Sequence, residues 1–162
     1  MSDVMALYTI KEKLFSFNRQ FSIDDANGAP VYYVDGKLIS FGRQLTMTDT
    51  AGSEVAYIKQ KLPALMATFE IYVGGQLALT VQQKLGLRPK FELIGPQWSV
   101  EGNWTGHEYD ILDASGLAQG HVSKQWATLA DTFTVQTPDN APDTQVLAVV
   151  IAIDMALASN RR

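Results

Sequence analysis

The sequence predicts an all-β domain that closes into an antiparallel barrel around one central helix, and two observations carry this prediction. Short stretches with alternating apolar and polar residues follow one another along most of the chain, separated by glycine-bearing turns, as is typical of antiparallel sheets. One long apolar run, Val146–Ala158, then stands near the C-terminus. Because closure removes the exposed edges of a sheet, we expect a barrel whose interior the apolar run fills as a helix.

The apolar run is expected to be a core helix of about Thr144–Ser159. It contains a single charge, Asp154, and its length gives only about 20 Å as a helix, against roughly 30 Å of bilayer hydrocarbon. It is apolar around almost its whole circumference, so other elements should enclose it on every side. The competing interpretation is a tail that inserts into a membrane.

Glycine-bearing turns mark the individual strands. We expect Val31–Val34 and Lys37–Ser40 to form a hairpin through Asp35-Gly36, because Asp-Gly supplies the positive φ that a two-residue turn needs. A second hairpin should turn at Gly74-Gly75. Further strands are predicted at Tyr8–Lys13, Tyr57–Lys61, Lys90–Leu93, Trp98–Trp104 and Phe133–Thr137.

The strand around Trp98 has large apolar residues at every second position. Trp98, Val100 and Trp104 should therefore face the interior. Gly102 lies on the same face, and we expect it to make room for the helix.

One short pattern occurs three times after an alternating strand: Asp, two further residues, then Gly. The three instances are Asp25 to Gly28, Asp49 to Gly52 and Asp113 to Gly116. The Asp side chain can bond the backbone two residues on, and Gly accepts the left-handed conformation that closes the hairpin. We interpret the pattern as a turn device, because the further ligands of a calcium-binding loop are missing.

Length and composition exclude several classes of protein. The chain has 162 residues, of which 46% are hydrophobic and 19% charged. This length suits one globular domain over 1–162, and this composition excludes a disordered chain. A net charge of −4 argues against general nucleic-acid binding. The absence of cysteine and of an apolar N-terminal leader predicts a cytoplasmic protein.

Two basic stretches are the candidate ligand-binding residues. Lys59 and Lys61 lie two apart on a predicted strand and share a face, and Lys84, Arg88 and Lys90 form the second stretch. If the stretches adjoin across a barrel face, they make a cationic patch for phosphates, such as an anionic headgroup. The alternative is an ordinary solvated strand face whose lysines discourage edge pairing.

No catalytic set, metal site or cofactor is predicted. His107 and His121 are the only histidines, and we expect both at the surface because no nucleophile elbow or metal-ligand spacing accompanies them. Asp154 is expected to be a structural buried carboxylate, because a charge inside an enclosed apolar helix needs a partner; the alternative is a carboxylate that forms part of a ligand pocket. The hypothesis predicts that Asp154→Leu destabilises the fold.

Several segments, in this order, resemble the LURP-one-related family. Besides the Asp-x-x-Gly hairpins they are Ile58–Lys61, Phe69–Tyr72, Trp98–Trp104, Val122–Lys124, Asp131–Val135 and Val149–Asp154. The family is similar in fold to the Tubby C-terminal domain and to phospholipid scramblases, so the resemblance implies a barrel of roughly twelve strands around a buried C-terminal helix. Tubby domains bind membrane phosphoinositides through basic residues. No Tubby lipid-site motif is matched, so no binding residue is carried over.

We therefore expect a non-enzymatic binding module, peripheral at a membrane surface, that binds an anionic lipid headgroup or another phosphate-bearing or amphipathic ligand. The alternative function is a protein-interaction or scaffold domain with no small-molecule ligand. No nucleic-acid partner and no transmembrane segment are expected.

Overall fold

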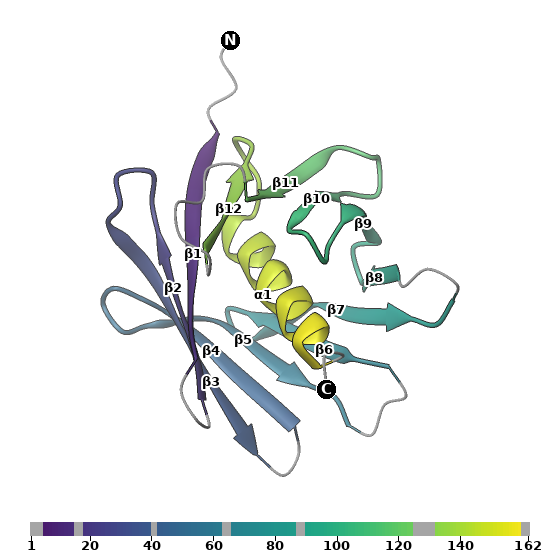
Figure 1. The fold of residues 1–162 in the computed structure, drawn as a ribbon, viewed down its shortest axis with the longest axis horizontal. Coiled ribbons are helices and arrows are strands. Elements are labelled where there is room, and N and C mark those ends of the chain that lie inside the picture. Colours follow the sequence, from purple (N-terminus) through teal and green to yellow (C-terminus); the bar gives the residue numbers. More distant parts are fainter. Residues whose placement is uncertain are drawn as a thin grey trace.

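The computed structural model describes residues 5–14, 18–39, 42–62, 66–86, 90–124 and 132–159. It is a closed barrel of antiparallel strands with one helix inside (Figure 1). The elements are β1 Ala6–Leu14, β2 Asn18–Asp24, β3 Pro30–Ile39, β4 Gly42–Asp49, β5 Glu54–Gln60, β6 Thr68–Val73, β7 Gln76–Lys84, β8 Lys90–Ile94, β9 Trp98–Asn103, β10 Glu108–Leu112, β11 Ala118–Ser123, β12 Thr132–Thr137 and α1 Asp143–Ser159. The predicted fold class and the predicted helix are confirmed.

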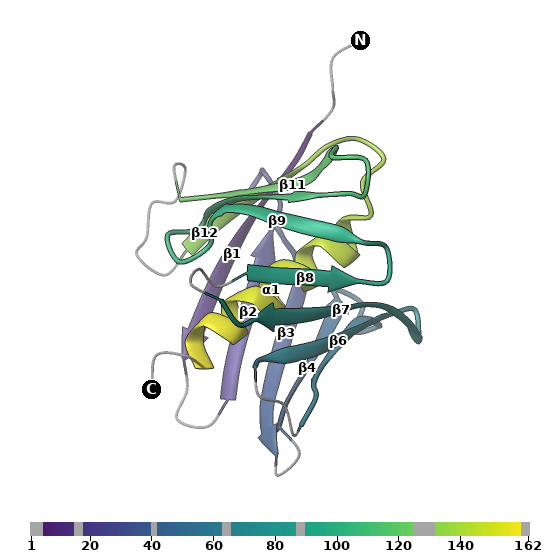
Figure 2. The same ribbon diagram turned by 90° about the vertical axis from the view of Figure 1, so that its right-hand side faces the viewer.

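The strand order determines which residues share an end of the barrel. Each strand pairs with its neighbours in the chain, and β1 pairs with β12 to close the ring. Odd-numbered strands therefore finish where even-numbered strands begin. The helix enters the barrel after β12 and runs the other way, so it finishes at the same end as the odd-numbered strands. In Figure 2, β7 and α1 both run towards the left.

The helix fills the barrel. Every residue from Val146 to Ile153 has 0% exposure, and α1 packs against β5, β6, β7, β11 and β12. The inward residues of the strands complete this core, among them Ile58, Phe69 and Ile71. A helix that is apolar all round is stable here because the strands surround it.

Glycine makes room for the helix at Gly120 on β11, a position that the sequence did not reveal. A Cβ atom at Gly120 would lie 2.7 Å from Cγ1 of Val146. Non-bonded carbon atoms do not approach one another this closely. The prediction for Gly102 was wrong. That residue is exposed, with φ +124°, and a Cβ atom there would meet Tyr109 of β10 at 2.8 Å from its Cα rather than the helix.

Trp98, Val100 and Trp104 pack against the core, as predicted from their alternate spacing. The Trp104 ring lies edge-on to Phe91, with ring centroids 5.4 Å apart. Aromatic pairs prefer this arrangement because the ring edge is positive and the face negative.

The three Asp-x-x-Gly segments form the same turn. In the first, Asp25 Oδ1 accepts hydrogen bonds from the backbone N–H groups of Asn27 (2.9 Å) and Ala29 (3.0 Å), while Gly28 donates to the Asp25 carbonyl at 3.0 Å. Asp49 and Asp113 repeat this pattern. All three glycines have positive φ, so the interpretation as a turn device is confirmed.

The expected hairpin at Asp35-Gly36 was wrong, whereas the one at Gly74-Gly75 is confirmed. Asp35 and Gly36 lie inside the continuous strand β3, paired with β2 on one side and β4 on the other. Burial alternates without a break, with Val34 and Gly36 inside and Asp35 and Lys37 outside. Two-sided pairing and this inward pattern outweigh the local turn preference of Asp-Gly.

Candidate functional site

The lysines and arginines gather at one end of the barrel. All those whose side chains the structure describes lie in the half of a strand, or in the loop, nearest the end where α1 finishes. They are Lys11, Lys37, Arg43, Lys59, Lys61, Lys84, Lys90 and Lys124. We call this the basic end. Described carboxylates lie at both ends: Glu70, Glu101 and Glu108 at the basic end, and Asp49, Glu54 and Asp113 at the opposite end, which carries none of these cations.

The first predicted basic stretch lies at this end. Lys59 and Lys61 are both exposed. Lys59 stands opposite Glu70 of β6 in the ladder. Lys61 follows β5, and its backbone N–H donates to the carbonyl of Thr68 at 2.9 Å. Both ammonium groups are therefore accessible from solvent.

The second predicted stretch lies at the same end, beyond β6. Lys84 ends β7 and stands directly opposite Lys90, the first residue of β8. Lys84 also forms an ion pair with Glu92 at 3.4 Å. Arg88 lies outside the described residues. The two stretches therefore share one end of the barrel, with strand β6 between them.

Some of these cations form ion pairs within the protein. Lys11 forms an ion pair with Asp24 at 2.9 Å. By contrast, four exposed lysines make no ion pair with any residue that the structure describes: Lys37, Lys59, Lys61 and Lys90. These ammonium groups can bind an external anion without first breaking an internal ion pair.

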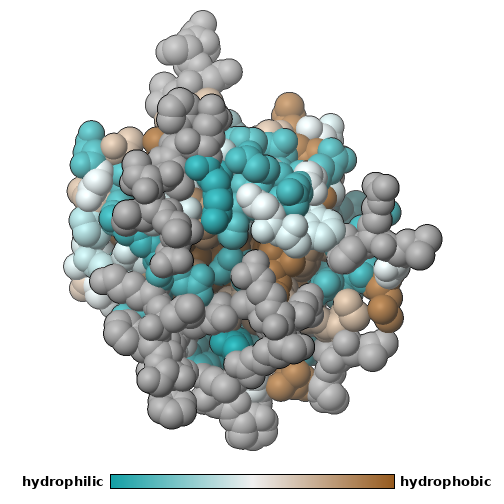
Figure 3. Space-filling model, viewed as in Figure 1, coloured by the Kyte–Doolittle hydropathy of each residue, from teal (hydrophilic) through white to brown (hydrophobic). Residues whose placement is uncertain are grey.

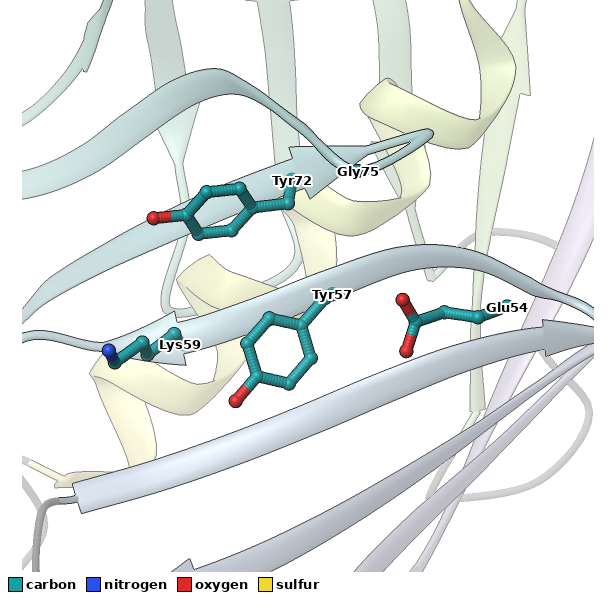
Figure 4. Close-up of a pocket in the computed structure, with 5 residues that line it drawn as sticks. All are labelled: Glu54, Tyr57, Lys59, Tyr72 and Gly75. Carbon is teal, nitrogen blue, oxygen red and sulfur yellow. The ribbon is translucent and has the colours of Figure 1, made fainter.

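An open depression of about 430 Å³ lies on the outer face of β5 and β6. Its centre is the cross-strand pair of Tyr57 and Tyr72, whose ring centroids are 6.2 Å apart. Figure 4 shows Lys59 on one side of the Tyr57 ring and Glu54 on the other. Burial, followed by electrostatic repulsion from Glu54 and Tyr72, raises the pKa of Tyr57.

Asp154 and His107 meet at the basic end. The His107 Nε2 atom lies 3.2 Å from Asp154 Oδ1, and the two side chains are only 15% and 13% exposed. His107 belongs to the β9–β10 turn, where it has φ +55° and its ring stacks on Phe133 at 4.5 Å. The expectation of a surface histidine was wrong here. This contact joins α1 to a turn of the barrel.

His121 makes a second contact with a carboxylate, on the outer face. Its Nδ1 lies 2.7 Å from Asp110 Oδ1 across the β10–β11 ladder, and both side chains are more than 40% exposed. Nearby, Glu108 accepts hydrogen bonds from the Lys124 backbone and the Ser123 hydroxyl, which lower the pKa of its carboxyl group. These contacts support the strand ends. Among the described residues, no three His, Asp or Glu side chains are grouped to hold a metal ion.

Comparison with known proteins identifies the family. The model of the LURP-one-related family matches residues 6–154. The chain belongs to the LURP-one-related family. A curated relative, the uncharacterized protein YxjI of Bacillus subtilis (strain 168), is 32% identical over 149 residues, which cover 91% of each chain.

The LURP-one-related fold also has a counterpart among solved structures. The X-ray structure of the Arabidopsis thaliana protein AT5G01750 matches with a TM-score of 0.62 and 16% identity, over 92% of this chain and 91% of that one. At this identity the likeness concerns the fold. No helix among the described residues is long and apolar enough to cross a membrane.

On the face of this LURP-one-related chain shown in Figure 3, hydrophilic and hydrophobic residues alternate over the surface. The hydrophobic residues between the grey atoms form small separate patches. Sequence reasoning found Lys59, Lys61, Lys84 and Lys90 as candidates but missed other cations at the same end, among them Lys37, Arg43 and Lys124. The signal that could have found them is the alternation of strand direction. In an up-and-down barrel, the ends of odd strands meet the starts of even strands.

Proposed function

We propose that this LURP-one-related chain is a non-enzymatic binding domain whose basic end receives an anionic lipid headgroup, or another phosphate-bearing group, at a membrane surface. The observation that supports the proposal is the gathering of the described lysines and arginines at one end of the barrel. Clustered lysines attract anionic headgroups at about 1 kcal/mol for each lysine near the surface.

The filled interior favours binding on the outside. Small barrels hold ligands in their interior only when side chains leave space there. Here α1 occupies the centre, with 0% exposure from Val146 to Ile153. A ligand of this domain therefore has to bind at the outer face or at a rim.

The negative net charge is compatible with binding to an anionic surface because the two ends are far apart. The ten residues of β3 rise about 3.3 Å each, and a tilted strand of this length spans about 25 Å along the barrel axis. The Debye length at physiological ionic strength is only about 8 Å. With the basic end against a membrane, repulsion from the carboxylates at the opposite end is therefore largely screened.

Co-sedimentation with vesicles tests the proposal. We expect the chain to bind vesicles of phosphatidylglycerol and phosphatidylcholine, with an affinity that falls as salt is added, and not to bind phosphatidylcholine alone. The double variant Lys59→Gln, Lys61→Gln removes two charges and should weaken binding by a factor of about 30 at low salt. Competition by free inorganic phosphate distinguishes a phosphate site from a requirement for a lipid surface.

The matched control is the double variant Thr50→Glu, Gln76→Glu. It changes the net charge by the same amount, but both exposed residues lie at the opposite end of the barrel. It should keep most of the affinity. Equal losses in the two double variants would mean that net charge alone governs binding, and the absence of binding to any vesicle would contradict the proposal.

A protein-interaction domain is the second candidate, favoured by the depression between Tyr57 and Tyr72. Tyrosine is enriched in protein interfaces because its ring is apolar and its hydroxyl forms hydrogen bonds. A purified partner of defined stoichiometry whose binding is lost in Tyr72→Ser, and kept in Lys61→Gln, Lys90→Gln, which lie outside the lining of the depression, would support this candidate. Retention of binding in Tyr72→Ser would contradict it.

A further inference from the structure

Two exposed leucines stand at the basic end, each directly after a lysine. Leu62 follows Lys61 beyond β5 and is 50% exposed, and Leu85 follows Lys84 beyond β7 and is 70% exposed. Only β6 lies between these two strands. Because neighbouring strands are about 4.8 Å apart, the ends of β5 and β7 lie about 10 Å apart on the rim. The Leu62 side chain lies on the β4 side of β5, where its Cδ1 would be 3.1 Å from a Cβ atom at Gly42.

The other large exposed apolar side chains have different neighbours. Those that the structure describes on the opposite half of the barrel are Met5, Tyr33, Leu77, Ile94 and Leu117. Leu117, for example, closes a turn in which its N–H donates to Asp113. Among the described residues, an exposed leucine next to a lysine therefore occurs only at the basic end.

Lysine next to an exposed leucine suits the boundary between headgroups and acyl chains. The ammonium group pairs with a phosphate while the alkyl stem of lysine extends along apolar surface. Stable attachment at a membrane generally needs an apolar signal besides a basic one. The ion pair of Lys84 with Glu92, at 3.4 Å and half exposed, is weak enough for a phosphate to replace.

We propose that Leu62 and Leu85 insert into the outer part of the acyl layer of an anionic bilayer while the lysines of the basic end bind headgroup phosphates. This inference rests on the proposed function and adds to it the depth and orientation of binding. It places the axis of the barrel across the plane of the membrane, with the end opposite the basic end towards solvent.

The absence of cysteine from the chain permits a direct test. Single cysteines replace Leu62, Leu85, Leu77 or Leu117, and each carries an environment-sensitive fluorophore. The last two positions are matched controls, with exposures of 53% and 66% at the opposite end. With phosphatidylglycerol-containing vesicles, we expect a blue shift and quenching by brominated lipids at positions 62 and 85, and neither at 77 and 117.

The outcomes separate the two proposals. If the unlabelled chain sediments with anionic vesicles but positions 62 and 85 show no shift, insertion is wrong and the proposed function stands. A shift at all four positions would overturn the orientation. If the chain does not sediment at all, the proposed function fails and the insertion inference fails with it.

A double substitution provides an independent readout. Each methylene group moved out of water changes partitioning by about four-fold, so Leu62→Gln, Leu85→Gln should weaken vesicle binding by about ten-fold or more. The slope of affinity against salt should stay unchanged, because every charge remains. The control pair Leu77→Gln, Leu117→Gln should bind as the parent chain does, and equal losses in both pairs would overturn the inference.

Discussion

At the scale of single residues, burial rather than distance determines which charged contacts stabilise the fold. Asp154 and His107 are 3.2 Å apart and mostly buried, whereas Asp110 and His121 are 2.7 Å apart and half exposed. Water replaces the partner of an exposed group at little cost. A buried group that loses its partner keeps its full desolvation penalty. The longer contact should therefore contribute more to stability.

We expect Asp154→Leu to lower the free energy of unfolding by about 1–3 kcal/mol, because it leaves Nε2 of the mostly buried His107 without its partner. The matched variant Asp110→Leu should change it by less than about 1 kcal/mol. Chemical denaturation of both variants measures the difference. An Asp154→Leu variant as stable as the parent would contradict the interpretation.

At the scale of elements, the position of α1 inside the barrel depends on one close approach between the helix and strand β11. Gly120 lets β11 pass Val146 where a Cβ atom would come within 2.7 Å of its side chain. Val146 has little freedom to move, because it is fully buried and its β-branched side chain has one strongly preferred rotamer in a helix. The shapes of the barrel wall and of the helix are therefore complementary at this position.

The variant Gly120→Ala should lose about 1–3 kcal/mol of stability through overpacking. Adding Val146→Ala should recover part of this loss, because it removes the methyl group that the new Cβ meets. A double-mutant cycle with thermal or chemical unfolding gives the coupling. Strict additivity of the two substitutions would show that they do not share this contact.

At the scale of the whole molecule, the barrel and its helix depend on each other. The inward strand residues, such as Ile58 and Phe69, are buried together with α1 in one core. Without the helix these side chains would line a large apolar cavity, and cavities in a core cost stability in proportion to their volume. The same closed topology brings the described cations to one end.

A chain truncated after residue 142, before α1, should therefore fail to form the native barrel. We expect it to bind a hydrophobic dye and to lose both near-UV circular dichroism and cooperative unfolding. A truncated chain that unfolds cooperatively, with a native-like near-UV spectrum, would show that the sheet closes without its core.

Much of the fold could be predicted from local patterns. The Asp-x-x-Gly turns form from hydrogen bonds within five residues, so neighbouring residues are enough to specify them. The helix is equally predictable, because only a surrounding core suits an element that is apolar all round. Of the candidate site, the sequence yielded four described lysines but neither their common end nor the other cations there.

The features that the sequence left undetermined depend on residues far apart in the chain. Asp35-Gly36 favours a turn locally, yet strand pairing on both sides keeps β3 continuous. An extra hairpin there would reverse the direction of the following strands and with it the end at which each lysine lies. Tertiary structure also brought His107 to Asp154 and made Gly120, rather than Gly102, the position where the helix passes.

The sequence by itself determined the strands, turns and core helix because their causes are local. Only the closed barrel decided the charge distribution, because it fixes how strand ends come together.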